Sequence, residues 1–123
     1  MFMPGIPQVW YLDLFAGKND YAAADKGGPA GHKEINRTTL ANSDIEQGLS
    51  RIVVRDQLEL MRLRNKSPAF YGELEIHDSD EHRLHLTWTH HGCVATLNAD
   101  LRDYGFSVTH KGEYCEEYVT SYR

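Results

Sequence analysis

The chain has 123 residues, of which 41% are apolar and 25% charged, as in an ordinary soluble globular protein. Thirteen Lys and Arg against 18 Asp and Glu give a net charge of −5, which disfavours a nucleic-acid partner because such binding depends on basic patches. No run approaches the roughly 20 apolar residues that span a bilayer, so we expect no membrane partner. Two cysteines, Cys93 and Cys115, are too few for a disulfide framework, and the first residues lack a secretion leader, so we expect a cytoplasmic protein.

The first 40 residues do not read like the beginning of an independent domain. Residues 4–7 form a Pro/Gly turn, and the apolar run from Gln8 to Leu12 predicts a short strand buried on both faces, as in parallel sheets. Such a strand needs neighbours that the other segments do not supply. Residues 16–39 show no sustained period and several glycines, which predicts a long irregular loop. Loops of that length are often functional.

A helix is expected over residues 43–65. Ser43 and Glu46 fit the capping-box pattern at its start, and Gly48 marks a place where the helix could break. Pro68 blocks its continuation. An apolar stripe at three- and four-residue steps predicts one buried face, formed by Ile45, Leu49, Ile52, Val53, Leu58 and Met61.

The second half changes to a period of two. Alternating apolar residues begin at Leu74, Leu84, Cys93 and Phe106, and turn-forming residues separate these runs. The pattern predicts an antiparallel meander of four or five strands with one apolar face, which the preceding helix could cover. The fold class expected for the chain is therefore α+β.

Three other groups of residues resemble binding sites: a glycine-rich stretch, a histidine cluster and a set of aromatic residues. The stretch Gly27 to Lys33 lacks the spacing of a phosphate-binding loop and has Pro29 in place of an amide donor. The histidines around residues 82–91 lack zinc-ligand spacing, so we interpret them as solvated surface residues and expect no metal and no cofactor. Five aromatic residues could form a platform on which a sugar stacks: Trp88, Phe106, Tyr114, Tyr118 and Tyr122. For Trp88 and Phe106 we favour packing in the core.

Three motifs in a fixed order carry a resemblance. The run Pro4-Gly5-Ile6-Pro7-Gln8-Val9-Trp10-Tyr11 is followed by Ala16-Gly17-Lys18-Asn19-Asp20 and by Gly31-His32-Lys33-Glu34-Ile35-Asn36-Arg37. Together they closely resemble the sucrose phosphorylase subfamily of α-amylase-like glycosidases (glycoside hydrolase family 13). The resemblance is strong over residues 2–66, where the Arg64-Asn65 helix end also fits, and weaker over residues 67–123.

The resemblance implies a domain arrangement and a chemistry. Residues 1–66 would be the last strand, loop and helix of a catalytic (β/α)8 barrel, and residues 67–123 a small antiparallel β domain. The family transfers a glucosyl group with retention to inorganic phosphate and releases glucose 1-phosphate. Its catalytic carboxylates lie on barrel strands that precede this region, and a whole barrel needs about 250 residues. We therefore expect no catalytic residue here, and a fragment that is inactive alone.

One substrate contact carries over through the resemblance. The Arg of the Ile-Asn-Arg motif, here Arg37, would reach the glucosyl unit with its planar fork of donors. Asn36 and His32 are weaker candidates on the same loop. Lys18, Asn19 and Asp20 could either contact the substrate or only brace the barrel mouth, and Asp13 could be a barrel-end carboxylate with a role in the site or a polar strand cap. The alternative to an enzyme fragment is a stand-alone sugar-binding or interaction module. An unpaired apolar strand would also make the isolated chain oligomerise or aggregate.

Overall fold

The computed structural model describes residues 1–112 and 118–122, the latter by their backbone. The chain divides into two compact units: residues 1–5 with 62–123, and residues 6–61. We call them the sheet unit and the helical unit.

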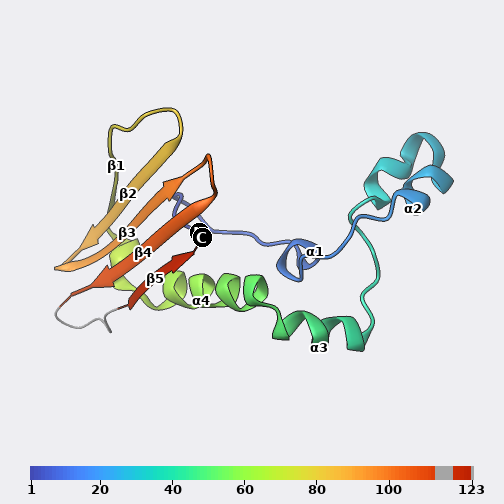
Figure 1. The fold of residues 1–123 in the computed structure, drawn as a ribbon, viewed down its shortest axis with the longest axis horizontal. Helices are drawn as coiled ribbons and strands as arrows, with labels where there is room; N and C mark the ends of the chain where they lie inside the picture. The colour runs from blue at the N-terminus through green and yellow to red at the C-terminus, as the bar shows by residue number, and fades with distance from the viewer. Residues whose placement is uncertain (113–117, 123) are drawn as a thin grey trace. The chain divides into compact units, whose positions relative to one another are not determined.

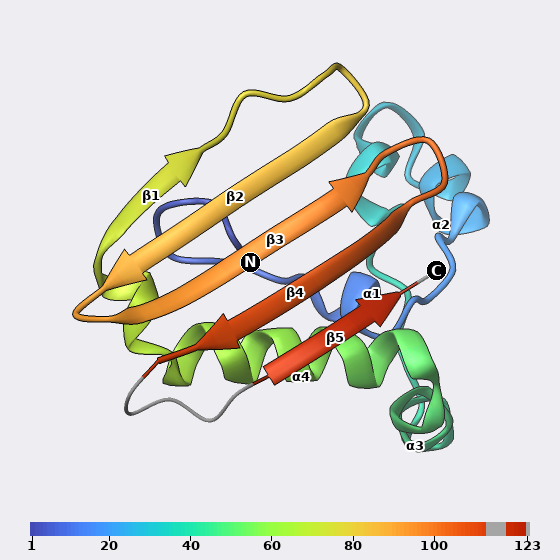
Figure 2. The same cartoon turned by 60° about the vertical axis from the view of Figure 1, so that its left-hand side comes forward.

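The described part of the sheet unit contains one five-stranded antiparallel sheet (Figure 1). Its strands are β1 (Glu73–Ile76), β2 (Arg83–His90), β3 (Cys93–Asp100), β4 (Gly105–Lys111) and β5 (Tyr118–Tyr122). They lie side by side in chain order, as Figure 2 shows from a second direction. The α+β class and the meander predicted from the period of two are confirmed. The β2–β3 turn uses His91 and Gly92, whose φ angles of 44° and 81° are left-handed, a conformation that glycine adopts at no steric cost.

One face of the sheet is buried. The register pairs Leu86 with Leu97 and Trp88 with Ala95, so these side chains share a face, and Leu86, Trp88, Ala95 and Val108 are buried. Trp88 is thus a core residue, as predicted. Phe106 is half-buried on the same face, and the side chains of Tyr114, Tyr118 and Tyr122 lie outside the described residues.

Two phenylalanines cover this face within the sheet unit. Phe70 belongs to η2 (Pro68–Tyr71), and its ring meets those of Phe2 and Trp88 edge to face, with centroids 5.3 and 5.8 Å apart. The indole Nε1 of Trp88 donates to the carbonyl O of Phe2 at 2.6 Å. Residues 1–5 are therefore anchored to β2 by one buried hydrogen bond and to η2 by one aromatic contact.

Arg64 packs against the same aromatic cluster. Its guanidinium carbon lies 4.5 Å from the Phe70 ring centroid and 5.0 Å from that of Trp88, a cation–π geometry, and Nη2 donates to the Gly5 carbonyl at 3.0 Å. Nη1 is buried without a hydrogen-bond partner among the described residues. Burial lowers the pKa of Arg64, because removal from water disfavours the charged form.

The helical unit corrects the first strand prediction. Residues 6–10 are irregular, and α1 (Tyr11–Leu14) is a single helical turn, so the predicted strand from Gln8 to Leu12 does not form. Leu12 is buried, but Gln8 is exposed and Val9 only half-buried. The run carries the side chains of a buried strand, yet none of the described strands pairs with it. Without a partner its backbone groups gain nothing from an extended conformation.

The predicted long loop also contains regular structure. It folds into α2 (Tyr21–Lys26), capped by the Asp20 carboxylate, and the 3-10 helix η1 (Gly28–Glu34). Gly31 is buried so closely against α2 that a Cβ there would lie 1.7 Å from the Ala24 carbonyl oxygen. The glycines that suggested an irregular loop instead permit two short helices to pack tightly.

The predicted long helix is two helices, α3 (Asn42–Ser50) and α4 (Ile52–Lys66). The break falls at Arg51, which is extended, three residues beyond the predicted Gly48. The first helix is capped at Ala41, whose amide donates to the Asp44 carboxylate at 2.8 Å, and not at Ser43. Pro68 follows the end of α4, as predicted.

The stripe prediction is wrong at the junction of these two helices. Leu49, Ile52 and Val53 are exposed, whereas Val54 is fully buried. The extended Arg51 shifts the phase of α4 relative to α3, so residues that share a face on one continuous helix no longer do so. No helix in the described part of the chain is long and apolar enough to cross a membrane.

Candidate functional site

Arg37 follows η1, and hydrogen bonds from two aromatic side chains hold the backbone around it. Trp10 Nε1 donates to the carbonyl O of Asn36 at 2.8 Å, and the Tyr11 hydroxyl donates to that of Thr38 at 2.9 Å. The two acceptors flank Arg37 in the chain. The first and third motifs of the family signature are thus joined directly, and the backbone of Arg37 is positioned by residues about 26 positions earlier.

The Arg37 side chain is open to solvent. It is 53% exposed, and its Nη1 lies 3.2 Å from the Glu34 carboxylate one turn earlier. Such exposed pairs contribute little, so most of the guanidinium fork remains available to an acceptor. In the described residues Glu34 is its only side-chain hydrogen-bond partner.

The other two predicted contacts do not gather around Arg37. His32 and Asn36 are exposed, and among the described residues no hydrogen bond joins either side chain to that of Arg37. Asn36 contributes through its backbone carbonyl instead. Asp20 caps α2, since its Oδ1 accepts from the Ala23 amide at 2.9 Å.

A cavity of about 290 Å³ lies next to this loop within the helical unit. Lys18 and Thr38 line one part of it, and Asp44 and Arg51 on the α3 side line another. Arg51 Nη1 donates to the carbonyls of Phe15 and Ala16, each at 3.0 Å. Its guanidinium is therefore already used to terminate α1.

A larger groove, of about 640 Å³, lies in the sheet unit where the β1–β2 and β3–β4 turns meet. It is lined mainly by polar residues, among them Asp80, His85, Asn98 and Asp100. No local sequence pattern predicts this groove, because its two aspartate-rich turns are about 20 residues apart in the chain. The register brings them together by pairing Arg83 with Asp100.

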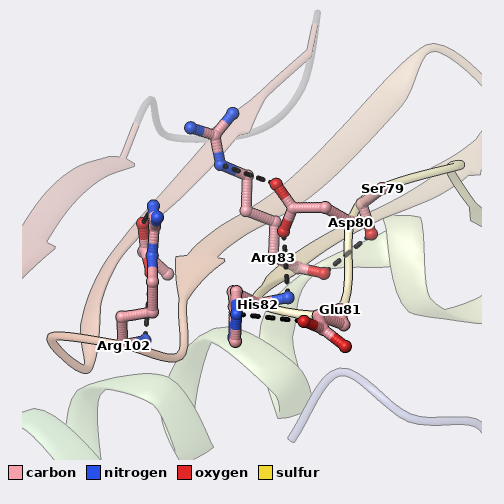
Figure 3. Close-up of polar contacts among 7 residues, drawn as sticks. Ser79, Asp80, Glu81, His82, Arg83 and Arg102 are labelled. Atoms are coloured by element: carbon pink, nitrogen blue, oxygen red, sulfur yellow. Dashed lines mark hydrogen bonds and ion pairs between the residues drawn. The ribbon is translucent and has the colours of Figure 1, made fainter.

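Close-range pairing accounts for most charges of this groove (Figure 3). Arg102 Nη2 donates to Asp100 Oδ2 at 2.6 Å, and Arg83 Nε lies 3.7 Å from Asp80 Oδ2. The hydrogen bonds from Arg102 hold the pKa of Asp100 far below its usual range. Asp80 also accepts from the amide of His82 at 2.9 Å, so these residues mainly stabilise their own turns.

Two histidines depart from the solvated-surface interpretation, because His85 and His90 are both half-buried, and the His90 ring contacts those of Tyr71 and His91. The His85 ring is half-buried and stacks on the ring of His77, with centroids 3.9 Å apart. His77 Nε2 in turn lies 2.9 Å from Thr87 Oγ1. Residues 1–112 and the described strand β5 contain no group of three or more His, Cys, Asp or Glu that could hold a metal ion.

Comparison with known proteins identifies relatives over nearly the whole chain. The chain is 57% identical over 111 residues to sucrose 6(F)-phosphate phosphorylase of Ilumatobacter coccineus, a match that covers 90% of this chain and 21% of the relative. It is 35% identical over 109 residues to glucosylglycerol phosphorylase of Marinobacter adhaerens, covering 89% of the chain and 22% of that protein. No family model matches the chain.

A solved structure confirms the relationship in three dimensions. The crystal structure of sucrose 6F-phosphate phosphorylase from Thermoanaerobacter thermosaccharolyticum superposes with a TM-score of 0.84 at 37% identity, covering 97% of this chain and 24% of that one. The chain thus spans less than a quarter of the length of these relatives. This protein is a homologue of the C-terminal region of sucrose phosphorylase and belongs with that family.

Proposed function

We propose that this chain forms the C-terminal part of an α-glucoside phosphorylase, which transfers a glucosyl group with retention to inorganic phosphate and yields glucose 1-phosphate. The observation that carries the proposal is the 57% identity to a sucrose 6(F)-phosphate phosphorylase over 90% of the chain. The named relatives are phosphorylases, which favours this function over a stand-alone sugar-binding module. A cytoplasmic location and a barrel origin for residues 1–66 are parts of the same proposal.

The proposed glucosyl donor is sucrose phosphorylated on its fructosyl part. The identity to the Ilumatobacter relative is 57%, against 35% to the glucosylglycerol enzyme and 34% to the sucrose phosphorylase of Agrobacterium vitis. These values favour sucrose 6(F)-phosphate over glucosylglycerol or plain sucrose as the substrate class.

Arg37 is the residue proposed to contact the glucosyl unit, with Asn36 and His32 as its neighbours on the loop. Support comes from its exposed guanidinium and from the aromatic side chains that anchor its backbone. A planar fork with several donors suits a sugar hydroxyl beside a carboxylate. The chain is proposed to supply this contact and no catalytic carboxylate.

The test is an assay of the purified 123-residue chain with sucrose 6(F)-phosphate and inorganic phosphate. Because the catalytic carboxylates are proposed to lie outside this chain, no glucose 1-phosphate should appear above a protein-free blank. Release above the blank that Arg37→Ala abolishes would show that the chain is a complete catalyst and would overturn the proposed division of roles.

A further inference from the structure

The polar groove of the sheet unit contains strand side chains whose hydrogen-bonding groups are unused. Three of its lining residues, His85, Asn98 and Ser107, come from β2, β3 and β4. Within residues 1–112 and the backbone of β5, none of these three side chains has a hydrogen-bond partner. The main charged residues of the adjoining turns are instead paired within those turns. The strand residues are therefore the ones that remain to bind a ligand.

These three side chains form one row across the sheet. The register pairs His85 with Asn98 and Asn98 with Ser107, on three strands that lie side by side (Figure 2). The row lies on the face opposite to the buried Leu86 and Val108, since successive strand residues point to opposite sides. With neighbouring strands about 4.8 Å apart, the row spans roughly 10 Å. That length suits a small ligand and is too short for a protein interface.

The ring of His85 is held in place before any ligand binds. It stacks on the ring of His77, with centroids 3.9 Å apart and an interplanar angle of 25°. His77 is itself fixed at both ring nitrogens, because Nε2 lies 2.9 Å from Thr87 Oγ1 and Nδ1 lies 3.3 Å from Glu75 Oε1. A ring oriented in this way loses little freedom when a ligand binds, so more of the contact energy contributes to affinity.

The charge of the groove disfavours an anionic ligand. Its lining includes four aspartates: Asp78, Asp80, Asp100 and Asp103. Arg83 and Arg102 pair with two of them, which leaves a net charge of about −2. A phosphate or carboxylate group would meet like charges there. The carboxylates do not form a metal site either, since in the described ranges no three His, Cys, Asp or Glu lie together in a way that could hold an ion.

We propose that the row of His85, Asn98 and Ser107 binds an uncharged polyhydroxy compound, namely a mono- or disaccharide. A sugar hydroxyl both donates and accepts, so it matches the amide of Asn98, the hydroxyl of Ser107 and the imidazole of His85. The volume of the groove, about 640 Å³, falls within the range of small-molecule sites. Because polar lining buries little apolar surface, we expect a Kd of about 1–10 mM.

This inference goes beyond the proposed function and does not depend on it. All three residues of the row belong to the sheet unit, whereas Arg37 belongs to the helical unit. Sugar binding by the row requires no catalytic carboxylate, so it can be measured on the 123-residue chain itself.

The test measures binding of glucose and of sucrose to the full chain by saturation-transfer NMR, which observes the ligand and works in any oligomeric state of the protein. Both sugars should show saturation transfer. Asn98→Ala should raise the Kd about three- to tenfold, the factor expected for the loss of one or two neutral hydrogen bonds. The matched control is Asn65→Ala, at another exposed asparagine of the sheet unit that does not line the groove, and it should leave the Kd unchanged. Urea unfolding with an unchanged midpoint verifies that both variants are folded.

Three results would overturn the inference. Absence of saturation transfer from the folded chain at about 50 mM sugar, well above the expected Kd, would exclude a saccharide site. Equal Kd values for Asn98→Ala and Asn65→Ala would show that the row takes no part in binding. Tighter binding of ethylamine than of glucose, weakened by added salt, would assign the groove to a cation.

Arg37→Ala separates this inference from the proposed function. Saturation transfer that is retained in Arg37→Ala and reduced in Asn98→Ala supports the groove as the binding site, whatever the outcome of the glucose 1-phosphate assay. The reverse pattern would assign sugar binding to the loop that carries Arg37. It would overturn this inference and support the proposed glucosyl contact.

Discussion

Ser67 offers the sharpest test of what stabilises the sheet unit. Its hydroxyl lies 2.7 Å from His110 Nε2 and accepts from the Ala69 amide at 3.2 Å. Both side chains are deep in the core, with 2% of Ser67 and 6% of His110 exposed. Ser67→Ala removes one buried hydrogen-bond partner of the imidazole, at a cost of about 1–3 kcal/mol, and the cap of η2, at a cost of about 1 kcal/mol. We expect the free energy of unfolding to fall by about 2–4 kcal/mol.

The measurement needs a probe that reports on the sheet unit. The chain has two tryptophans, so in a Trp10→Phe background the fluorescence comes from Trp88 in the core. Urea unfolding of Ser67→Ala should show a lower midpoint with an unchanged slope, as expected when stability alone changes. Thr89→Ala, at an exposed position of β2, is the control and should cost less than about 1 kcal/mol. A change for Ser67→Ala no larger than that of the control would refute the importance of the buried hydroxyl–imidazole pair.

Two further predictions concern the remaining parts of the chain. Gly31→Ala should destabilise the α2–η1 packing by about 1–3 kcal/mol or more, because the new Cβ meets the Ala24 carbonyl. Faster amide hydrogen exchange in residues 21–34 would reveal this loss of stability. The control is Gly28→Ala, where the space is open but φ is +57°, and it should lower the stability by only about 1–2 kcal/mol. Arg102→Gln should raise the pKa of Asp100 toward about 3.9, since Arg102 is the main cause of its depression. Because the pKa of Asp100 is lowered in the folded protein, its pair with Arg102 stabilises the fold above the unfolded pKa and loses this effect as pH falls through the folded pKa. The NMR shift of the Asp100 carboxyl should therefore change with pH near 4 in the variant and not in the wild-type protein. A wild-type titration midpoint near 4 would contradict the pairing.

Local residue patterns were enough to predict the antiparallel sheet and the family. Apolar residues that alternate along a strand lie on one face of the sheet, because successive strand residues point to opposite sides. Leu86, Trp88 and Val108 are buried on that face. Pro68 ended the helix for a reason local to its own ring. The three motifs between Pro4 and Arg37 indicated a relationship that the identity and the TM-score confirm.

For the segments with ambiguous patterns, the conformation depends on contacts with residues distant in the chain. The run from Gln8 to Leu12 suits a buried strand, but a strand needs partners, and α1 with irregular residues forms where none of the described strands pairs with it. The break at Arg51 places its guanidinium on the carbonyls that end α1, a contact between residues some 35 positions apart. Burial of His110 against Ser67 likewise depends on the strand register and the end of α4. A local pattern predicts the period of an element. It does not predict which distant residue pairs with a strand edge, a helix end or a buried imidazole, because those partners come together only in the folded chain.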